Sequence, residues 1–269
     1  MPLDFSTSEF SAPEFSVVVP VFNEEGAAEA LALEIASAFD GESFEILFVD
    51  DASTDATRTR LTAMKARLPM LRVITHARNA GQSRAIRTGV LAARAPFVVT
   101  LDGDGQNDPA DAPRLARALR DGPARLGLIG GLRLRRQDSL AKRWASRLGN
   151  SVRNGLLRDG AADTGCGLKA FRREAFLRLP YFDHLHRFLP ALFQREGYDL
   201  AFEPVGHRAR TTGASKYTNL GRLFASAPDL LGVMWLRSRA RDPGAMEEVE
   251  VALQPSHPQQ KRPRQRRGP

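Results

Sequence analysis

Two acids that directly follow a short apolar run offer the clearest chemistry in this chain. After Val98-Val99-Thr100-Leu101 the sequence continues Asp102-Gly103-Asp104-Gly105-Gln106-Asn107-Asp108-Pro109. Carboxylates at this spacing repel each other unless a cation or hydrogen-bond donors hold them, and such hard oxygen ligands suit Mg²⁺ or Mn²⁺. The glycines between them let the backbone turn tightly and leave room for a ligand. The spacing therefore predicts a divalent-metal site at Asp102 and Asp104.

Other uses of acids and glycines at this spacing fit less well. A calcium-binding EF-hand loop counted from Asp102 needs glycine at its sixth position and glutamate at its twelfth, where this chain has Asn107 and Pro113. A dinucleotide-binding loop needs a third glycine before a helix, which is missing here. A plain strand-to-helix turn accounts for Asp108, which can cap a helix starting at Pro109, but leaves Asp102 and Asp104 unexplained.

The elements that position these acids alternate between strand and helix. Apolar runs predict strands at residues 15–20, 44–49, 71–75 and 96–101, with a helix after each of the first three. The second of these helices is expected to be capped by Ser53 or Thr54. Such alternation gives βαβ units and a parallel sheet, so the fold class is α/β. Ligand-binding loops should lie at one sheet edge, after Val19, Val49 and Leu101. All three loops begin with polar or acidic residues, which favours a ligand of nucleotide size.

The second half of the chain is more basic. Strands are predicted at residues 126–132 and 199–205, and a helix-prone segment from Phe171. Residues 139–157 repeat an apolar side chain every four positions, which predicts an amphipathic helix. On it Arg143 and Arg147 lie one turn apart on one face, together with Asn150 and Ser151. That face is either an ordinary solvated surface or a phosphate site.

Cysteine and histidine are not expected to carry chemistry here. Cys166 lies in a stretch of small residues without an obvious partner base, so we predict a buried or wall-lining residue and no nucleophile. His184 and His186 are two positions apart and would not share a helix face, which argues against a histidine metal pair.

Composition limits the class of protein. The 269 residues are 42% hydrophobic, enough for a sizeable core, and carry a net charge of +8. A basic chain favours an acidic partner, namely nucleic acid, anionic lipid or a phosphorylated substrate. Low aromatic content and the lack of a recognisable binding motif argue against nucleic acid. We expect no signal peptide, no bilayer-spanning segment and, with one cysteine, no internal disulfide.

Five motifs taken together resemble glycosyltransferase family 2, of GT-A fold, and within it the polyprenyl-phosphate sugar synthases such as dolichyl-phosphate mannose synthase. The motifs are Val-Pro-Val-Phe-Asn-Glu-Glu from residue 19, Val-Asp-Asp-Ala-Ser-Thr-Asp from 49, Leu-Asp-Gly-Asp-Gly-Gln-Asn-Asp-Pro from 101, Asp-Thr-Gly-Cys-Gly-Leu-Lys from 163 and Arg-x-x-Gly-x-Ser-Lys-Tyr from 210. The first three indicate the broad family, and the last two indicate the lipid-phosphate branch. The match covers residues 15–235. It implies a Rossmann-like, mostly parallel sheet flanked by helices.

The resemblance also assigns roles to individual residues. It implies that Asp102, Asp104 and Arg133 are the catalytic residues. Asp102 and Asp104 are also implied to bind the metal, with Gln106 as a further ligand, and both acids, Gly103 and Arg133 are implied to bind the nucleotide-sugar. The residues implied to bind the nucleotide-sugar also include Pro20, Phe22, Glu24, Asp50, Arg210 and Lys216. Arg147 and Ser151 are implied to bind the acceptor phosphate.

The expected reaction is metal-dependent, inverting transfer of a hexose from a UDP- or GDP-sugar to a polyprenyl phosphate. A lipid phosphate is already ionised at neutral pH, so the nucleophile needs charge cancellation rather than a strong base. A family 2 enzyme acting on a glycan or protein hydroxyl is the first alternative, and a non-catalytic nucleic-acid-binding protein is the second. A nucleotidyltransferase would need a Gly-rich, lysine-bearing phosphate loop near the first strand, which is missing.

The expected domain organisation places the catalytic domain at residues 15–219, between a disordered stretch at 1–14 and two basic C-terminal segments. Residues 220–241 form an amphipathic helix, which lies either on a membrane surface or in the core. Residues 242–269 are expected to be a disordered basic tail attracted to anionic lipid. We therefore expect a cytoplasmic enzyme, peripheral on the inner face of the cytoplasmic membrane, with a small membrane protein as an optional partner.

Overall fold

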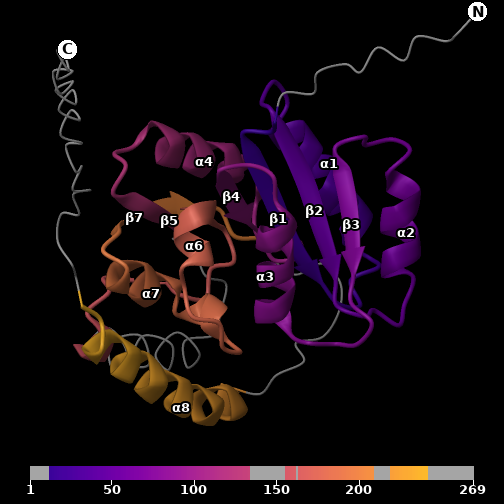
Figure 1. Cartoon of the computed structure of the whole chain (residues 1–269). Coiled ribbons are helices and arrows are strands. Elements are labelled where there is room, and N and C mark those ends of the chain that lie inside the picture. The colour runs from indigo at the N-terminus through magenta and orange to yellow at the C-terminus, as the bar shows by residue number, and fades with distance from the viewer. Residues whose placement is uncertain (1–11, 134–154, 162, 209–218, 242–269) are drawn as a thin grey trace, which may run out of the picture.

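The fold is a seven-stranded sheet with helices on both faces (Figure 1). It is seen in a computed structural model that describes residues 12–133, 155–161, 163–208 and 219–241, with the backbone alone for 219–226. The strands are β1 Phe15–Val21, β2 Phe44–Asp50, β3 Leu71–Thr75, β4 Phe97–Thr100, β5 Leu126–Arg133, β6 Lys169–Arg172 and β7 Asp199–Val205. The helices are α1 Ala28–Ala38, α2 Thr57–Met64, α3 Gln82–Ala92, α4 Ala112–Asp121, α6 Arg173–Leu177, α7 Leu189–Arg195 and α8 Asn219–Ser238, with short 3-10 turns η1 Pro109–Asp111 and η2 Leu185–Arg187.

The strand order β3-β2-β1-β4-β6-β5-β7 brings the predicted functional loops to one edge. β1 pairs in parallel with β2 on one side and β4 on the other, so that Val17 lies opposite Ile46 and Val99. β6 runs antiparallel to both β4 and β5, and β7 is parallel to β5. All strands except β6 therefore point the same way, and the carboxyl ends of β1, β2 and β4 open side by side.

The central strands are buried on both faces, which explains their continuous apolar runs. Val17, Val19 and Phe48 pack toward α1, α2 and α4, whereas Val18 and Leu47 pack toward α3 and the elements after β6. Successive side chains of a strand point to opposite faces, so both helical layers rest on the same strands.

Most of the predicted elements are confirmed, with two corrections. Ser53 and Thr54 do not cap a helix, since α2 begins at Thr57 and both instead bind Asn23 across the site edge. Phe171 does not begin a helix but lies in β6, where it pairs with Val98 and Leu128. Just before β1, the Glu14 amide donates to the Ser43 carbonyl at 2.8 Å.

Most of the amphipathic helix predicted at 139–157 lies outside the described residues. Only residues 155–157 of it are described, and they are helical. The basic face with Arg143 and Arg147 therefore remains a prediction.

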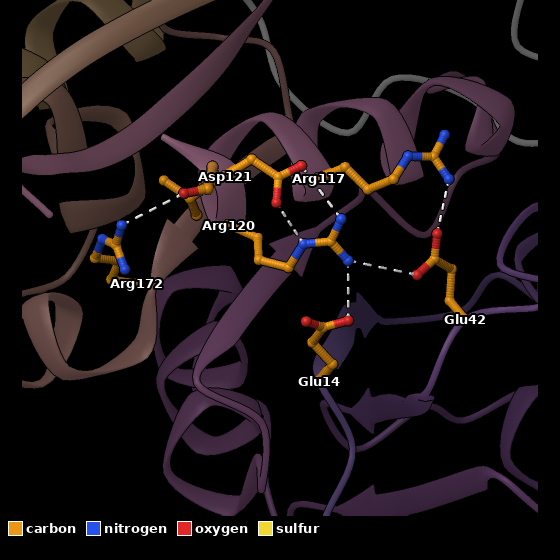
Figure 2. Close-up of polar contacts among 7 residues, drawn as sticks. Glu14, Glu42, Arg117, Arg120, Asp121 and Arg172 are labelled. Atoms are coloured by element: carbon orange, nitrogen blue, oxygen red, sulfur yellow. Dashed lines mark hydrogen bonds and ion pairs between the residues drawn. The ribbon is translucent and has the colours of Figure 1, made fainter. Parts of the chain in front are cut away.

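Charged groups close the amino edge of the sheet, opposite the predicted site (Figure 2). Arg120, near the end of α4, donates to Glu14 at 3.1 Å and to Asp121 at 2.8 Å. Arg117 pairs with Glu42 at 2.7 Å, just before β2. These contacts tie α4 to the starts of β1 and β2.

Candidate functional site

The loop that carries Asp102 and Asp104 lies directly across the end of β1. A Cβ atom added to Gly103 would stand 2.7 Å from the Pro20 carbonyl oxygen and 2.6 Å from Val21 Cγ1, so no side chain fits there. The end of β2 is tied to the same place, because the Asp51 amide donates to the Val21 carbonyl at 2.9 Å. The structure thus brings Pro20, Asp50 and the Asp102–Asp104 loop to one edge, as the sequence predicted.

The loops after β1 and β2 hold each other through side chains. Asn23 adopts a left-handed backbone conformation with φ 55°. Its amide donates to Ser53 Oγ at 2.9 Å, and its Oδ1 accepts from the Thr54 amide at 2.8 Å. The next residue, Glu24, donates its amide to Thr57 Oγ1 at 2.9 Å. These bonds fix the loop that carries Phe22 and Glu24 to the loop after β2, where the buried Asp50 accepts from the Ser53 amide at 3.1 Å.

The Asp102 carboxylate is held from two sides. Gln82, at the start of α3, donates Nε2 to Asp102 Oδ1 at 2.8 Å. On another side, a Cβ added to Gly167 would stand only 2.2 Å from Asp102 Oδ2. Burial raises the pKa of Asp102, and the nearby negative charge of Asp104 raises it further, against the opposing effects of Lys169 and Arg133. A cation beside Asp102 and Asp104 would relieve both effects.

Asp104 and the loop after it are also braced. Asp104 Oδ1 accepts from the Gln106 amide at 3.1 Å, and Asn107 Oδ1 accepts from the Asp102 amide at 2.9 Å. The Gln106 carbonyl accepts from the Arg208 amide at 2.9 Å, just after β7. The Arg208 guanidinium reaches Asp108 Oδ1 at 2.8 Å, and Asp108 caps η1 by accepting from the Ala110 amide, as predicted.

Arg133 reaches the site from the end of β5 and is fixed there by Asp163. Its Nε and Nη2 each donate to an oxygen of Asp163 at 2.7 Å, a two-point pairing that sets the plane of the guanidinium. Gly165 leaves room for it, since an added Cβ would lie 3.1 Å from Arg133 Nη2. The positive charge of Arg133 lies close enough to Asp102 to oppose the rise of its pKa.

Lys169 holds the loop between Asp163 and Leu168 in place. It is buried, and its Nζ donates to the Cys166 carbonyl and, at 3.5 Å, to the Thr164 carbonyl. Burial lowers the pKa of Lys169. The motif from Asp163 to Lys169 therefore forms one side of the site. Asp163 pairs with Arg133, Gly167 contacts the Asp102 carboxylate, and Lys169 donates to the carbonyl groups of the loop.

The predicted burial of Cys166 is confirmed, and the two histidines each have a partner of their own. Cys166 is buried with Sγ against Gly131, and burial raises the pKa of its thiol, which disfavours the reactive thiolate. His184 and His186 have separate partners, Asp229 at 3.0 Å and Ser83 at 2.7 Å.

Four predicted residues, Arg147, Ser151, Arg210 and Lys216, lie outside the described residues. Four others that the sequence did not single out contribute to the site, namely Gln82, Asp163, Gly167 and Lys169. The last three stand in a motif that was recognised as a whole but without a role for each residue. Nothing in the local sequence indicated a role for Gln82, because its partner Asp102 lies 20 positions further along the chain.

Comparison with known proteins places the chain in a family. The model for glycosyl transferase family 2 matches residues 16–179. Over 247 residues the chain is 34% identical to dodecaprenyl-phosphate galacturonate synthase of Rhizobium johnstonii, covering 89% of this chain and 72% of that protein. It is 35% identical to undecaprenyl-phosphate 4-deoxy-4-formamido-L-arabinose transferase of Edwardsiella ictaluri, covering 80% of this chain and 65% of that protein.

A solved structure shares the fold. Glucosyl-3-phosphoglycerate synthase from Mycobacterium tuberculosis, in complex with Mn²⁺, UDP and glucosyl-3-phosphoglycerate, superposes with a TM-score of 0.63 at 20% identity. The match covers 86% of this chain and 82% of that one. The expected GT-A type of α/β fold is confirmed.

Proposed function

Because the chain belongs to glycosyl transferase family 2, we propose that it moves a sugar from a UDP- or GDP-sugar onto a polyprenyl phosphate, with inversion and with a divalent metal ion. The observation that carries the proposal is the pair Asp102 and Asp104 beside the loops of β1 and β2. The choice of acceptor is supported by the names of two relatives, each of which specifies a polyprenyl phosphate and a sugar. This chain spans about two thirds of the length of each of those proteins, 72% and 65%.

The residues present fit Mg²⁺ or Mn²⁺. Asp102 and Asp104 offer two neighbouring carboxylates as oxygen ligands, and a bound cation would offset both the burial of Asp102 and the repulsion from Asp104 that raise its pKa. No group of three or more His, Cys, Asp or Glu side chains suited to one ion occurs in the part of the chain that the structure describes. We infer that substrate phosphate and water supply the remaining ligands, together with Gln106. When bound, the ion would neutralise the nucleoside diphosphate that leaves.

The protein's own residues then bind, orient and balance charge. Pro20, Phe22, Glu24 and Asp50 hold the nucleoside, and Gln82 with Gly167 keeps the Asp102 carboxylate in one orientation. Arg133 lies beside the donor, its plane set by Asp163. Arg210 follows Arg208 by two residues in the sequence, and we assign it with Lys216 to phosphate.

The reaction needs no strong general base. An oxygen of the ionised lipid phosphate attacks the anomeric carbon as the bond from that carbon to the diphosphate breaks, which inverts the anomeric centre. Two anions must approach each other in this step, so cationic side chains are required near the acceptor. We assign Arg147 and Ser151 to the acceptor phosphate. A hydroxyl acceptor would instead call for a carboxylate base.

The test is transfer of radiolabelled sugar into organic-extractable lipid. Purified protein would be given Mn²⁺ or Mg²⁺, polyprenyl phosphate and a panel of UDP- and GDP-sugars. We expect label in the lipid phase, reduced at least about 100-fold by Asp104→Asn, since one metal-binding carboxylate is lost. Asp121→Asn, an exposed acid at the opposite edge, is the matched control and should retain activity.

Three other outcomes separate the alternatives. Nucleotide-sugar binding without lipid labelling would favour a hydroxyl acceptor. Failure to bind any nucleotide-sugar would contradict the assignment of the site. Salt-dependent RNA retention without nucleotide-sugar binding would favour a nucleic-acid-binding protein.

We further propose that α8 holds the enzyme on the inner face of the cytoplasmic membrane. Leu230, Val233 and Met234 pack toward the core, whereas Leu231 and Trp235 are 66% and 59% exposed on the other side. Three arginines, 237, 239 and 241, follow at the end of the helix, where they favour anionic lipid. No helix in the described ranges has the length and apolarity to cross a bilayer.

A further inference from the structure

Side-chain hydrogen bonds connect Asp102 to a segment far from the metal site. Gln82, the first residue of α3, donates to Asp102 Oδ1 at 2.8 Å. The next residue, Ser83, is buried at 1% exposure, and its Oγ lies 2.7 Å from His186 Nδ1. The His186 amide also donates to Ser83 Oγ at 3.4 Å. The turn η2 is thus fastened to the residue beside Gln82.

Gln82 needs such support because it is exposed and begins a helix without a side-chain cap. The N-cap of α3 is Gly81, with φ 87°, which has no side chain to cap the first turn. Asp51 fixes the backbone just before Gln82, accepting from the amides of Ala80 at 2.9 Å and Gly81 at 2.8 Å. His186 fixes the residue just after it. The long Gln82 side chain is therefore anchored on both sides.

We propose that His186 is a positioning residue for the Asp102 carboxylate. Through Ser83 it fixes the first turn of α3, and this turn sets the place of Gln82 against Asp102. Holding one carboxylate oxygen at Gln82 presents the group to the ion in one orientation, as outer hydrogen bonds do at metal sites. The inference rests on the proposed function in one respect, the metal-binding role of Asp102.

The chain offers a graded set of variants. Ser83→Ala removes the hydroxyl with little change in volume, and His186→Phe keeps a ring but loses the bond. His186→Asn places an amide close to the position of Nδ1 and should keep the bond. Asp229→Ala is the matched control. It breaks the 3.0 Å contact with His184, which lies two residues before His186, and leaves the bond between His186 and Ser83 unchanged.

The first readout is the side-chain amide signal of Gln82 in NMR spectra, assigned by its absence in Gln82→Ala. Ser83→Ala and His186→Phe should shift this signal and speed its exchange with water, while Asp229→Ala and His186→Asn should match the wild type. The circular dichroism spectrum identifies any variant that has not folded. An unchanged Gln82 signal in folded Ser83→Ala would overturn the proposal whatever the metal does.

The second readout is Mn²⁺ binding, followed by electron paramagnetic resonance with UDP in one set of samples and GDP in another. We expect about tenfold weaker binding in Ser83→Ala and in His186→Phe, the usual range for loss of an outer partner. The double variant should be no weaker than either single one, because both remove the same bond. Unchanged Mn²⁺ affinity in both single variants would also overturn the proposal. A wild type that binds no Mn²⁺ with either nucleotide would contradict the proposed function alone, and the Gln82 signal would still decide the role of His186.

Discussion

A hydrogen atom on Gly167 occupies the place where any other residue would meet the Asp102 carboxylate. A Cβ added there would stand 2.2 Å from Oδ2 and 2.5 Å from Oδ1 of Asp102, well inside contact distance. Gly167→Ala should therefore turn Asp102 away from Gln82. We expect sugar transfer to fall about tenfold or more. We also expect the free energy of unfolding to fall by about 1–3 kcal/mol through overpacking.

The comparison for this prediction is Gly155→Ala. No atom lies within 4 Å of a Cβ added at Gly155, so the variant should keep both activity and stability. Sugar transfer and urea unfolding would be measured side by side. Full activity in Gly167→Ala would show that the orientation of Asp102 does not limit the reaction.

Residues at the site were predictable from the sequence where the signal was local. Asp102 and Asp104 follow an apolar run at close spacing, and such a pattern can be recognised without the fold. Gln82 and Gly167 act on Asp102 from other elements. Gly167 stands in the recognised motif from Asp163 to Lys169, but the local sequence of neither residue indicates a contact with Asp102. Such contacts depend on how the sheet brings α3 and the loop before β6 together.

At the scale of elements, the difference between local sequence patterns and contacts with distant elements explains why β6 was missed. β1 to β4 alternate with helices long enough to be recognised, and all four were predicted close to their observed bounds. β6 has four residues, two of them the cations Lys169 and Arg172, and α6 follows it without a loop. The sequence of β6 is helix-compatible, and it becomes a strand because β4 and β5 offer it hydrogen bonds on both sides.

The amino edge of the sheet carries stability and the carboxyl edge carries chemistry, and Glu45 tests this division. Its buried carboxylate accepts from Ser16 Oγ at 2.7 Å, Arg72 Nη1 at 2.6 Å and the Arg94 amide at 2.7 Å. Glu45→Ala removes the acceptor of the Ser16 hydroxyl and of the Arg94 amide, while Arg72 Nη1 keeps the Ala92 carbonyl at 2.9 Å, and we expect a loss of about 2 kcal/mol in the free energy of unfolding. Urea unfolding would measure it.

The activity of the folded Glu45→Ala protein should be unchanged, because Glu45 lies at the start of β2 and Asp50 at its end. Activity per folded molecule is therefore the decisive comparison. A large fall in it, at a temperature where the variant is fully folded, would refute the separation of the two edges. Glu42→Ala is a useful reference, since its pairs with Arg117 and Arg120 are more exposed and should matter less as salt is raised (Figure 2).

At the scale of the whole molecule, α8 has to serve two surfaces at once. Its inner side packs through Val233 into the core layer that also holds α3 and α7. Asp229 on the same helix binds His184 at 3.0 Å, next to the turn η2 that is fastened to α3. The helix is thus part of the folded body, while Leu231 and Trp235 remain directed to solvent. If Leu231 and Trp235 bind the membrane, the membrane contact is therefore made by the catalytic domain itself.

Leu231→Ser and Trp235→Ser test whether that exposed pair meets lipid. Burial of each side chain in the interface is worth about 1.5–3 kcal/mol, so each change should weaken binding to vesicles about tenfold or more. Co-sedimentation with phosphatidylglycerol vesicles measures this, and phosphatidylcholine vesicles should bind less, because the arginines that follow favour anionic lipid. Leu91→Ser, at a leucine 54% exposed on α3, is the control and should bind like the wild type.

With a short, water-soluble prenyl phosphate all three variants should turn over alike, since the catalytic edge is untouched. Vesicle binding that is equal in all of them would mean that α8 is an ordinary packing helix and that the membrane is met elsewhere.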